Sequence, residues 1–131
     1  PEESTTPYAA MISKKMGELD WAKSATELER LIRGLNPWPS AFTHLNGKML
    51  KIWDADVYTK EQAEAEFPEY STDFKGAEPG QIVAVLPHTF FIGCGKDLLK
   101  VNEVQAEGKK RMTSDAFLRG SRLEKGMELG K

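Results

Sequence analysis

The dipeptide Asn46-Gly47 constrains the fold of this chain more than any other short feature. Asn-Gly favours a type I′ turn, in which both central residues take positive φ, and this pair separates residues 41–45 from residues 48–57. In the second run the apolar Leu50 and Ile52 alternate with Lys51. The apolar parity then moves to Trp53, which indicates a β-bulge near residues 52–54. The sequence therefore predicts a β-hairpin with a bulged second strand.

Three further runs have the length and the apolar side chains of strands. They cover residues 81–86, 89–94 and 98–105, and Pro87-His88 and Gly95-Lys96-Asp97 between them suit tight turns. With one apolar parity each, about five or six strands must close or pack on themselves. We therefore predict a mainly β protein with a partly open, OB-like barrel. A two-layer α+β roll is the alternative.

One helix is predicted before the strands and a shorter one after them. Ser24 and Glu27 have the spacing of a capping box, in which each side chain accepts a hydrogen bond from the other residue's backbone amide. Apolar residues then recur at helical spacing until Pro37 ends the helix. Thr113 can cap a short C-terminal helix, and the tail from Ser121 is expected to be polar and irregular.

The segment between the first hairpin and the later strands is acidic. Residues 53–80 contain eight acidic side chains and two lysines, a net charge of −6. Residues 60–66 could form a helical turn or two, whereas Pro, Gly and Ser residues predict a loop for the remainder. Because such a long connection is unusual in a small barrel, we interpret residues 58–80 as a surface insertion.

The length of 131 residues corresponds to about one domain. We expect residues 1–20 to be a leader or interdomain linker with one short strand near residues 11–13, and residues 21–131 to be the domain. The single cysteine, Cys94, excludes an internal disulfide and a multi-cysteine zinc site, and it suggests a reducing, cytoplasmic setting. No apolar run approaches the roughly 20 residues of a membrane span, so no membrane partner is expected.

Residues suited to catalysis are few and scattered. His44 and His88 are far apart in the sequence and have no glutamate at a zinc-helix spacing, so both are expected at the surface or in turns. Cys94 lies in an apolar strand and is expected to be a packed side chain. Asp54 and Asp56 share a strand face, which could bind a metal or form a charged outer surface. No catalytic residue and no metal site are predicted.

Basic side chains are concentrated near the C-terminus although the whole chain has a net charge of −2. Residues 96–131 carry a net charge of +3. Lysine and arginine on the loops of OB-type barrels neutralise the phosphates of nucleic acids. The candidate RNA-binding residues are Lys109, Lys110, Arg111, Arg119 and Arg122, with Lys14, Lys15, Arg30, Arg33, Lys48 and Lys51 as further candidates. A tryptophan can stack on bases, but we expect Trp38 and Trp53 to be core anchors.

Several ordered motifs resemble the C-terminal domain of the methionyl-tRNA formyltransferases. They cover about residues 11–130 and comprise Ile12-Ser13-Lys14-Lys15, Asp20-Trp21, the run 28–35 followed by Asn36-Pro37-Trp38-Pro39, Asn46-Gly47-Lys48 with residues 50–53, residues 79–83, Gln105, residues 108–112 and residues 117–120. The resemblance implies structural roles for Trp21, Asn36, Pro37, Trp38, Pro39 and Trp53. It also implies an OB-like barrel.

The resemblance implies a function for the chain. This family transfers a formyl group from 10-formyltetrahydrofolate to the methionine on initiator tRNA, and its folate site and catalytic residues belong to an N-terminal domain that is absent here. The chain is therefore expected to bind no cofactor, to be inactive alone, and to partner initiator methionyl-tRNA and its own N-terminal domain. RNA-facing positions would include Lys14, Lys15, Lys109, Lys110, Arg111, Arg119 and Arg122. The acidic segment is expected to point away from the RNA.

Two alternatives remain at this point. Other enzymes that use 10-formyltetrahydrofolate carry a similar barrel that does not bind RNA. A free-standing barrel that binds another protein is the third reading.

Overall fold

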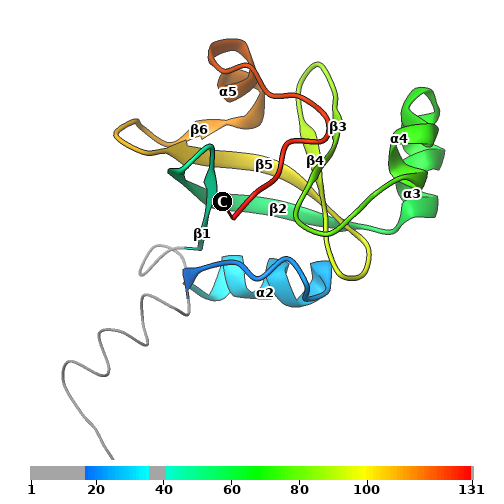
Figure 1. Ribbon diagram of the computed structural model, residues 1–131, viewed down its shortest axis with the longest axis horizontal. Coiled ribbons are helices and arrows are strands. Elements are labelled where there is room, and N and C mark those ends of the chain that lie inside the picture. The colour runs from blue at the N-terminus through cyan, green and yellow to red at the C-terminus, as the bar shows by residue number, and fades with distance from the viewer. Residues whose placement is uncertain (1–16, 36–40, 131) are drawn as a thin grey trace, which may run out of the picture.

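The computed structural model describes residues 17–35 and 41–130, and it confirms a mainly β architecture with a curled antiparallel sheet (Figure 1). The expected strand near residues 11–13 and the tetrad 36–39 lie outside the described residues. The strands are β1 (Phe42–Leu45), β2 (Lys48–Tyr58), β3 (Ile82–Val85), β4 (Phe90–Gly93), β5 (Leu98–Ala106) and β6 (Met112–Thr113). The helices are α2 (Ala25–Leu35), α3 (Lys60–Glu66), the 3-10 turn η1 (Pro68–Tyr70), α4 (Ser71–Lys75) and α5 (Ser114–Gly120).

The sheet has the strand order β1-β2-β5-β4-β3, and the two-residue strand β6, which the sequence did not predict, pairs with β5. Asn46 and Gly47 have φ values of 55° and 80°, so the predicted turn with two positive φ angles is confirmed. The register between β2 and β5 shifts between Ile52 and Ala55, which confirms the predicted bulge. Bulges increase local twist, and a long strand such as β2 must twist and bend to form part of a barrel.

The C-terminal tail connects the two edges of the sheet. Leu129 forms an isolated bridge with Leu45 on β1, and Glu128 forms one with Gln81, directly before β3. In Figure 1 this segment runs from α5 past β3 towards β1. Leu123 and Leu129 are both buried. Within its described residues the tail has no helix or regular strand, as expected, but it is not only polar, because two buried leucines and several backbone hydrogen bonds attach it to the barrel.

Helix α2 begins as predicted. The Ser24 amide donates to the Glu27 carboxylate at 3.1 Å, and the Glu27 amide donates to the Ser24 hydroxyl at 3.2 Å. One stripe of the helix, containing Ala25, Leu28 and Ile32, is buried in the main core. The Ala25 amide also donates to the Lys96 carbonyl in the β4–β5 turn at 2.9 Å, so the start of the helix is attached to the barrel.

The acidic segment is more ordered than expected. Beyond α3 the predicted loop contains η1 and α4, and Phe74 of α4 is fully buried. Phe74 packs edge-on against Phe91 of β4, with 4.9 Å between ring centroids. This contact belongs to a second hydrophobic cluster, while Phe90 and Ile92 of the same strand point into the main core. The prediction of one apolar parity per strand is thus wrong for β4, because the acidic segment covers its outer face.

Candidate functional site

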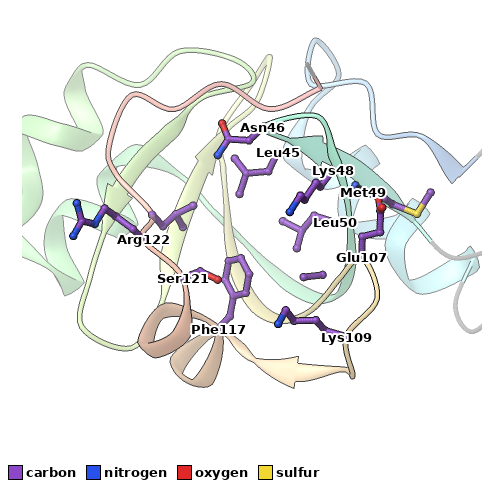
Figure 2. A pocket seen from close by; sticks show the side chains of 12 residues that line it. Leu45, Asn46, Lys48, Met49, Leu50, Glu107, Lys109, Phe117, Ser121 and Arg122 are labelled. Atoms are coloured by element: carbon purple, nitrogen blue, oxygen red, sulfur yellow. Dashed lines mark hydrogen bonds between the residues drawn. The ribbon is translucent and has the colours of Figure 1, made fainter.

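One end of the barrel contains a cavity of about 340 Å³, where the β1–β2 turn, the β5–β6 connection and the end of α5 meet (Figure 2). The strands bring these loops together because β2 and β5 are antiparallel, so the start of β2 lies beside the end of β5. The described lining residues are Leu45, Asn46, Lys48, Met49, Leu50, Ala106, Glu107, Lys109, Phe117, Ser121, Arg122 and Leu123.

The floor of this cavity is apolar. Leu50, Phe117 and Leu123 are buried members of the main core, and the half-buried Leu45 packs against it. Figure 2 shows the ring of Phe117 directed from α5 into the space between the loops. Thr113 caps α5 by accepting a hydrogen bond from the Ala116 amide at 3.2 Å, as the sequence predicted, and this helix start positions the ring.

Three of the predicted RNA-binding residues lie around the cavity. Lys48, Lys109 and Arg122 are exposed lining residues that come from three separate segments. Within the part of the chain that the structure describes, none of the three forms an ion pair. Figure 2 shows the ammonium groups of Lys48 and Lys109 directed towards the opening, and the guanidinium of Arg122 directed outward. Their positive charges are therefore available to a ligand.

The basic rim extends along α5. A neighbouring depression shares Ser121, Arg122 and Leu123 with the cavity and adds Arg119 to the lining. Arg119 lies 3.8 Å from Asp115, a carboxylate that also lies 2.9 Å from the His88 ring nitrogen. The hydrogen bond with His88, helped by the charge of Arg119, holds the pKa of Asp115 below its usual range. Asp115 therefore stays ionised and partly balances the charge of Arg119.

Arg111 has a different environment from the neighbouring lysines. Its guanidinium lies 4.7 Å from the centroid of the Trp53 ring and forms an ion pair with Glu103. The Trp53 indole donates to Gln105 at 3.0 Å. Trp53, which we expected to anchor the core, instead lies half-buried outside both hydrophobic clusters, because it continues the outward alternation of Lys51 and the buried parity changes only after it, at Ala55. Lys110, beside Arg111, is exposed.

The other predicted site residues lie elsewhere or outside the described residues. Arg33, in the last turn of α2, forms an ion pair with Glu29 at 2.6 Å, and Figure 1 shows α2 far from α5. Lys51 is half-buried on β2 opposite Gln105. Trp21 is buried and donates to the Thr43 hydroxyl at 3.1 Å. Lys14, Lys15, Asn36, Pro37, Trp38 and Pro39 are outside the described residues.

The described residues contain no arrangement suited to catalysis by a metal or a thiol. No group of three or more potential metal ligands occurs among them. Asp54 and Asp56 both accept hydrogen bonds from the Asn102 amide, at 2.9 and 3.0 Å, on the outer side of β2. Cys94 is buried, and burial raises the pKa of its thiol to about 12. A thiol in this environment is a packed side chain, as the sequence predicted, and is a poor nucleophile.

Sequence reasoning missed the apolar floor and the single acid of the cavity. Leu45, Leu50 and Phe117 were predicted only as parts of strands and a helix, and Glu107 was not singled out. A usable signal was present, since Asn46-Gly47 and Glu107-Gly108 both have turn composition. Turns at the start of one strand and the end of its antiparallel neighbour must share one end of a barrel. The neighbour relationship itself, however, is a tertiary property.

No helix among the described residues is both long enough and apolar enough to cross a membrane.

Comparison with known proteins agrees with the barrel. Residues 11–122 match the family described as formyl transferase, C-terminal domain. The methionyl-tRNA formyltransferase of Lachnospira eligens is 55% identical over 130 residues, which are 99% of this chain and 39% of that protein. The enzymes of the same name from Agathobacter rectalis and Geobacter metallireducens are 47% and 36% identical over 95% and 98% of this chain, and the matches cover 36% and 37% of those proteins.

The chain thus spans less than two fifths of the length of these relatives. Among solved structures, a variant of HypX from Aquifex aeolicus has a TM-score of 0.56 with 15% identity, covering 85% of this chain and 18% of that one. This likeness supports the fold alone. The family match covers most of the chain, and the relatives agree with it. The chain therefore belongs to the family of formyl transferase C-terminal domains.

Proposed function

We propose that this domain binds initiator methionyl-tRNA and positions it within a methionyl-tRNA formyltransferase. The observation that carries the proposal is the meeting of Lys48, Lys109 and Arg122 around one cavity without a described ion pair. The names of the relatives supply the enzyme to which such a domain would belong. Lys110 and Arg119 would extend the same basic rim.

We further propose that the chemistry takes place in the rest of that enzyme. The formyl donor, 10-formyltetrahydrofolate, and the catalytic groups would belong to an N-terminal domain that pairs with this one, and the isolated domain would be inactive. The free, buried Cys94 thiol is compatible with a cytoplasmic location for the enzyme. The contribution of this domain would be to hold the RNA so that its acceptor end reaches the catalytic groups.

Phosphate recognition by these basic side chains has a measurable consequence. Each phosphate that a lysine or arginine neutralises releases condensed counterions, so the logarithm of the affinity falls with the logarithm of the salt concentration, by about 0.9 per contact on B-form DNA and about 0.7 on single strands. We expect this dependence for the 131-residue chain with initiator tRNA. The double variant Lys109→Ala/Arg122→Ala should bind more weakly, with a salt slope shallower by about 2.

The test is a salt titration of initiator tRNA binding by fluorescence anisotropy. A matched control is Lys60→Ala/Lys75→Ala, which removes two positive charges from the acidic segment and should leave the slope unchanged. If both double variants weakened tRNA binding equally, the effect would come from the net charge of the domain and not from these positions. Salt-independent binding would remove these basic side chains from the RNA contacts, and no binding would favour a barrel that does not recognise RNA.

A further inference from the structure

The cavity has a property that recognition of phosphate does not require. Phosphates of a duplex lie on its surface, and surface lysines alone can neutralise them. Here Lys48 and Lys109, which form no described ion pair, border the opening of a cavity that has Leu50 and Phe117 at its floor. An occupant that matches both features carries a negative charge and a flat or apolar part attached to it.

We propose that the cavity receives one unpaired nucleotide of the bound RNA. The base enters against Leu50 and Phe117, and its flanking phosphates lie on Lys48 and Lys109. This inference rests on the proposed binding of RNA and adds to it the chemical form of the recognised element. The nucleotide has to be unpaired, because a base within a duplex would first have to leave its stack and lose its partner.

The chemistry of the lining residues fits a nucleotide. A base has apolar faces, which suit the leucines and the phenylalanine, and polar edges, which can hydrogen-bond to Asn46 and Ser121 at the opening. The β1–β2 turn and the β5–β6 connection lie at one end of the barrel, and OB-type barrels bind oligonucleotides in part through their loops. A cavity of about 340 Å³ has room for one base.

Charge also favours this occupant over an apolar or basic protein segment. Three of the twelve lining side chains are basic and one, Glu107, is acidic. The Glu107 carboxylate is held by the backbone amide of Met49 at 3.0 Å. The acidic segment with α3 and α4 lies at the far side of the molecule from the β5–β6 connection, so its charge does not border the opening (Figure 1).

The experiment follows methyl resonances by NMR in the 131-residue chain. The reporters are Leu45, Leu50 and Leu123 of the cavity, and the matched controls are Val83 and Leu98, which belong to the second hydrophobic cluster. The ligands are a single-stranded hexaribonucleotide, the same strand with abasic sites, and an RNA duplex of equal length. Initiator tRNA binding is measured in parallel.

We expect the single strand to shift the three cavity methyls through the ring current of the nucleobase and to leave the methyls of Val83 and Leu98 unchanged. The abasic strand should bind at least about fivefold more weakly, and the duplex should not move the cavity methyls. Ser121→Leu places an aliphatic group at the opening and keeps the three basic side chains of the lining. This variant should weaken single-strand binding and leave duplex binding unchanged. Thr26→Leu, on the exposed side of α2, is its control and should alter neither.

The possible failures are distinct. If tRNA binds with the expected salt dependence but the cavity methyls do not move, the nucleotide site is wrong and the proposed function stands. If an apolar peptide shifts these methyls and the single strand does not, the cavity is a protein-binding site and the inference is overturned. If neither tRNA nor any oligonucleotide binds, the inference and the proposed function fall together.

Discussion

Met49 and Glu107 are joined twice at the opening of the barrel. The Met49 amide donates to the Glu107 carboxylate at 3.0 Å, and the Glu107 amide donates to the Met49 carbonyl at 3.0 Å. The first bond places the one acidic side chain among the lining residues beside the rim that contains Lys48 and Lys109. The Glu107 carboxylate accepts the hydrogen bond of a β2 backbone amide, and its negative charge opposes the approach of a polyanion.

Replacing this carboxylate should therefore strengthen RNA binding. In Glu107→Gln the amide oxygen can still accept the hydrogen bond from Met49, while the negative charge is removed. We expect the affinity for initiator tRNA to rise by about two- to fivefold at low salt and to approach that of the original chain at high salt, since salt screens the charge. Anisotropy titrations at two salt concentrations measure this, with Glu61→Gln on α3 as control. Unchanged low-salt affinity would place the RNA elsewhere.

Gly95 should not tolerate a side chain. A Cβ atom built at this position would lie 1.9 Å from the carbonyl oxygen of Ala22, and backbone cannot move aside as a flexible side chain can. Gly95→Ala is expected to lower the free energy of unfolding by about 1–3 kcal/mol. Urea denaturation measures the change.

Gly34→Ala is the matched substitution on helix α2. Nothing lies within 4 Å of a Cβ atom at Gly34, so alanine should raise stability by about 0.5–1 kcal/mol through the lower entropy of the unfolded chain. An equal loss of stability in both variants would contradict the close approach of Gly95 to Ala22.

Cys94 should be unreactive in the folded protein. Burial raises the pKa of its thiol to about 12, so almost no thiolate is present at pH 8 and reagents have little access to it. Iodoacetamide should label the chain at pH 8 only after denaturation, as measured by mass spectrometry. Rapid labelling of the native chain, with unchanged circular dichroism, would show that the β4–β5 region opens readily.

Tyr58 should make stability sensitive to alkali. Burial, followed by the hydrogen bond to Glu66, raises the pKa of its hydroxyl to about 12. Because the folded state keeps the proton more tightly, the contribution is complete below the unfolded tyrosine pKa of about 10 and is lost as the pH rises towards 12. Tyr58→Phe keeps the edge-on contact with Phe91, which has 5.3 Å between ring centroids in the original chain, and removes the titrating group.

Urea midpoints measured between pH 9 and pH 12 should therefore fall less for Tyr58→Phe than for the original chain. The lysines titrate over the same interval in both proteins and cancel in the comparison. Parallel curves for the two proteins would show that the Tyr58 hydroxyl titrates alike in the folded and unfolded states.

Local patterns predicted the elements better than their surroundings. Ser24, Asn46-Gly47 and Thr113 each specify a local conformation through a hydrogen bond or a backbone preference within a few residues, and all three appear as expected. The acidic segment was harder to predict, because η1 and α4 are short and are stabilised by the contact of Phe74 with Phe91 rather than by their own sequence. The outward position of Trp53 was missed because the buried parity changes at Ala55 and not at Trp53, which only the β2–β5 register reveals.

The sequence predicted which basic residues could bind RNA, but not that some of them lie around one cavity. Lys109 and Arg122 were singled out from basic clusters and barrel loops, and Lys48 from its hairpin, but nothing in their spacing showed that they border one cavity. Arg33 and Lys51 were further candidates on the same grounds as Lys48, and they lie elsewhere. Charge along a chain carries no information about which segments become neighbours.

The sequence by itself determined the strands, the turn at Asn46-Gly47, the start of α2 and the family, because each depends on neighbouring residues or on an ordered series of motifs. Only the tertiary structure decided that Leu129 bridges to Leu45 and closes the edges of the sheet. It also decided that Lys48 and Lys109 share an opening above Phe117. The physical reason is that these relationships join residues far apart in the chain, and they form only when the antiparallel pairing of β2 with β5 and burial of the tail leucines bring those residues together.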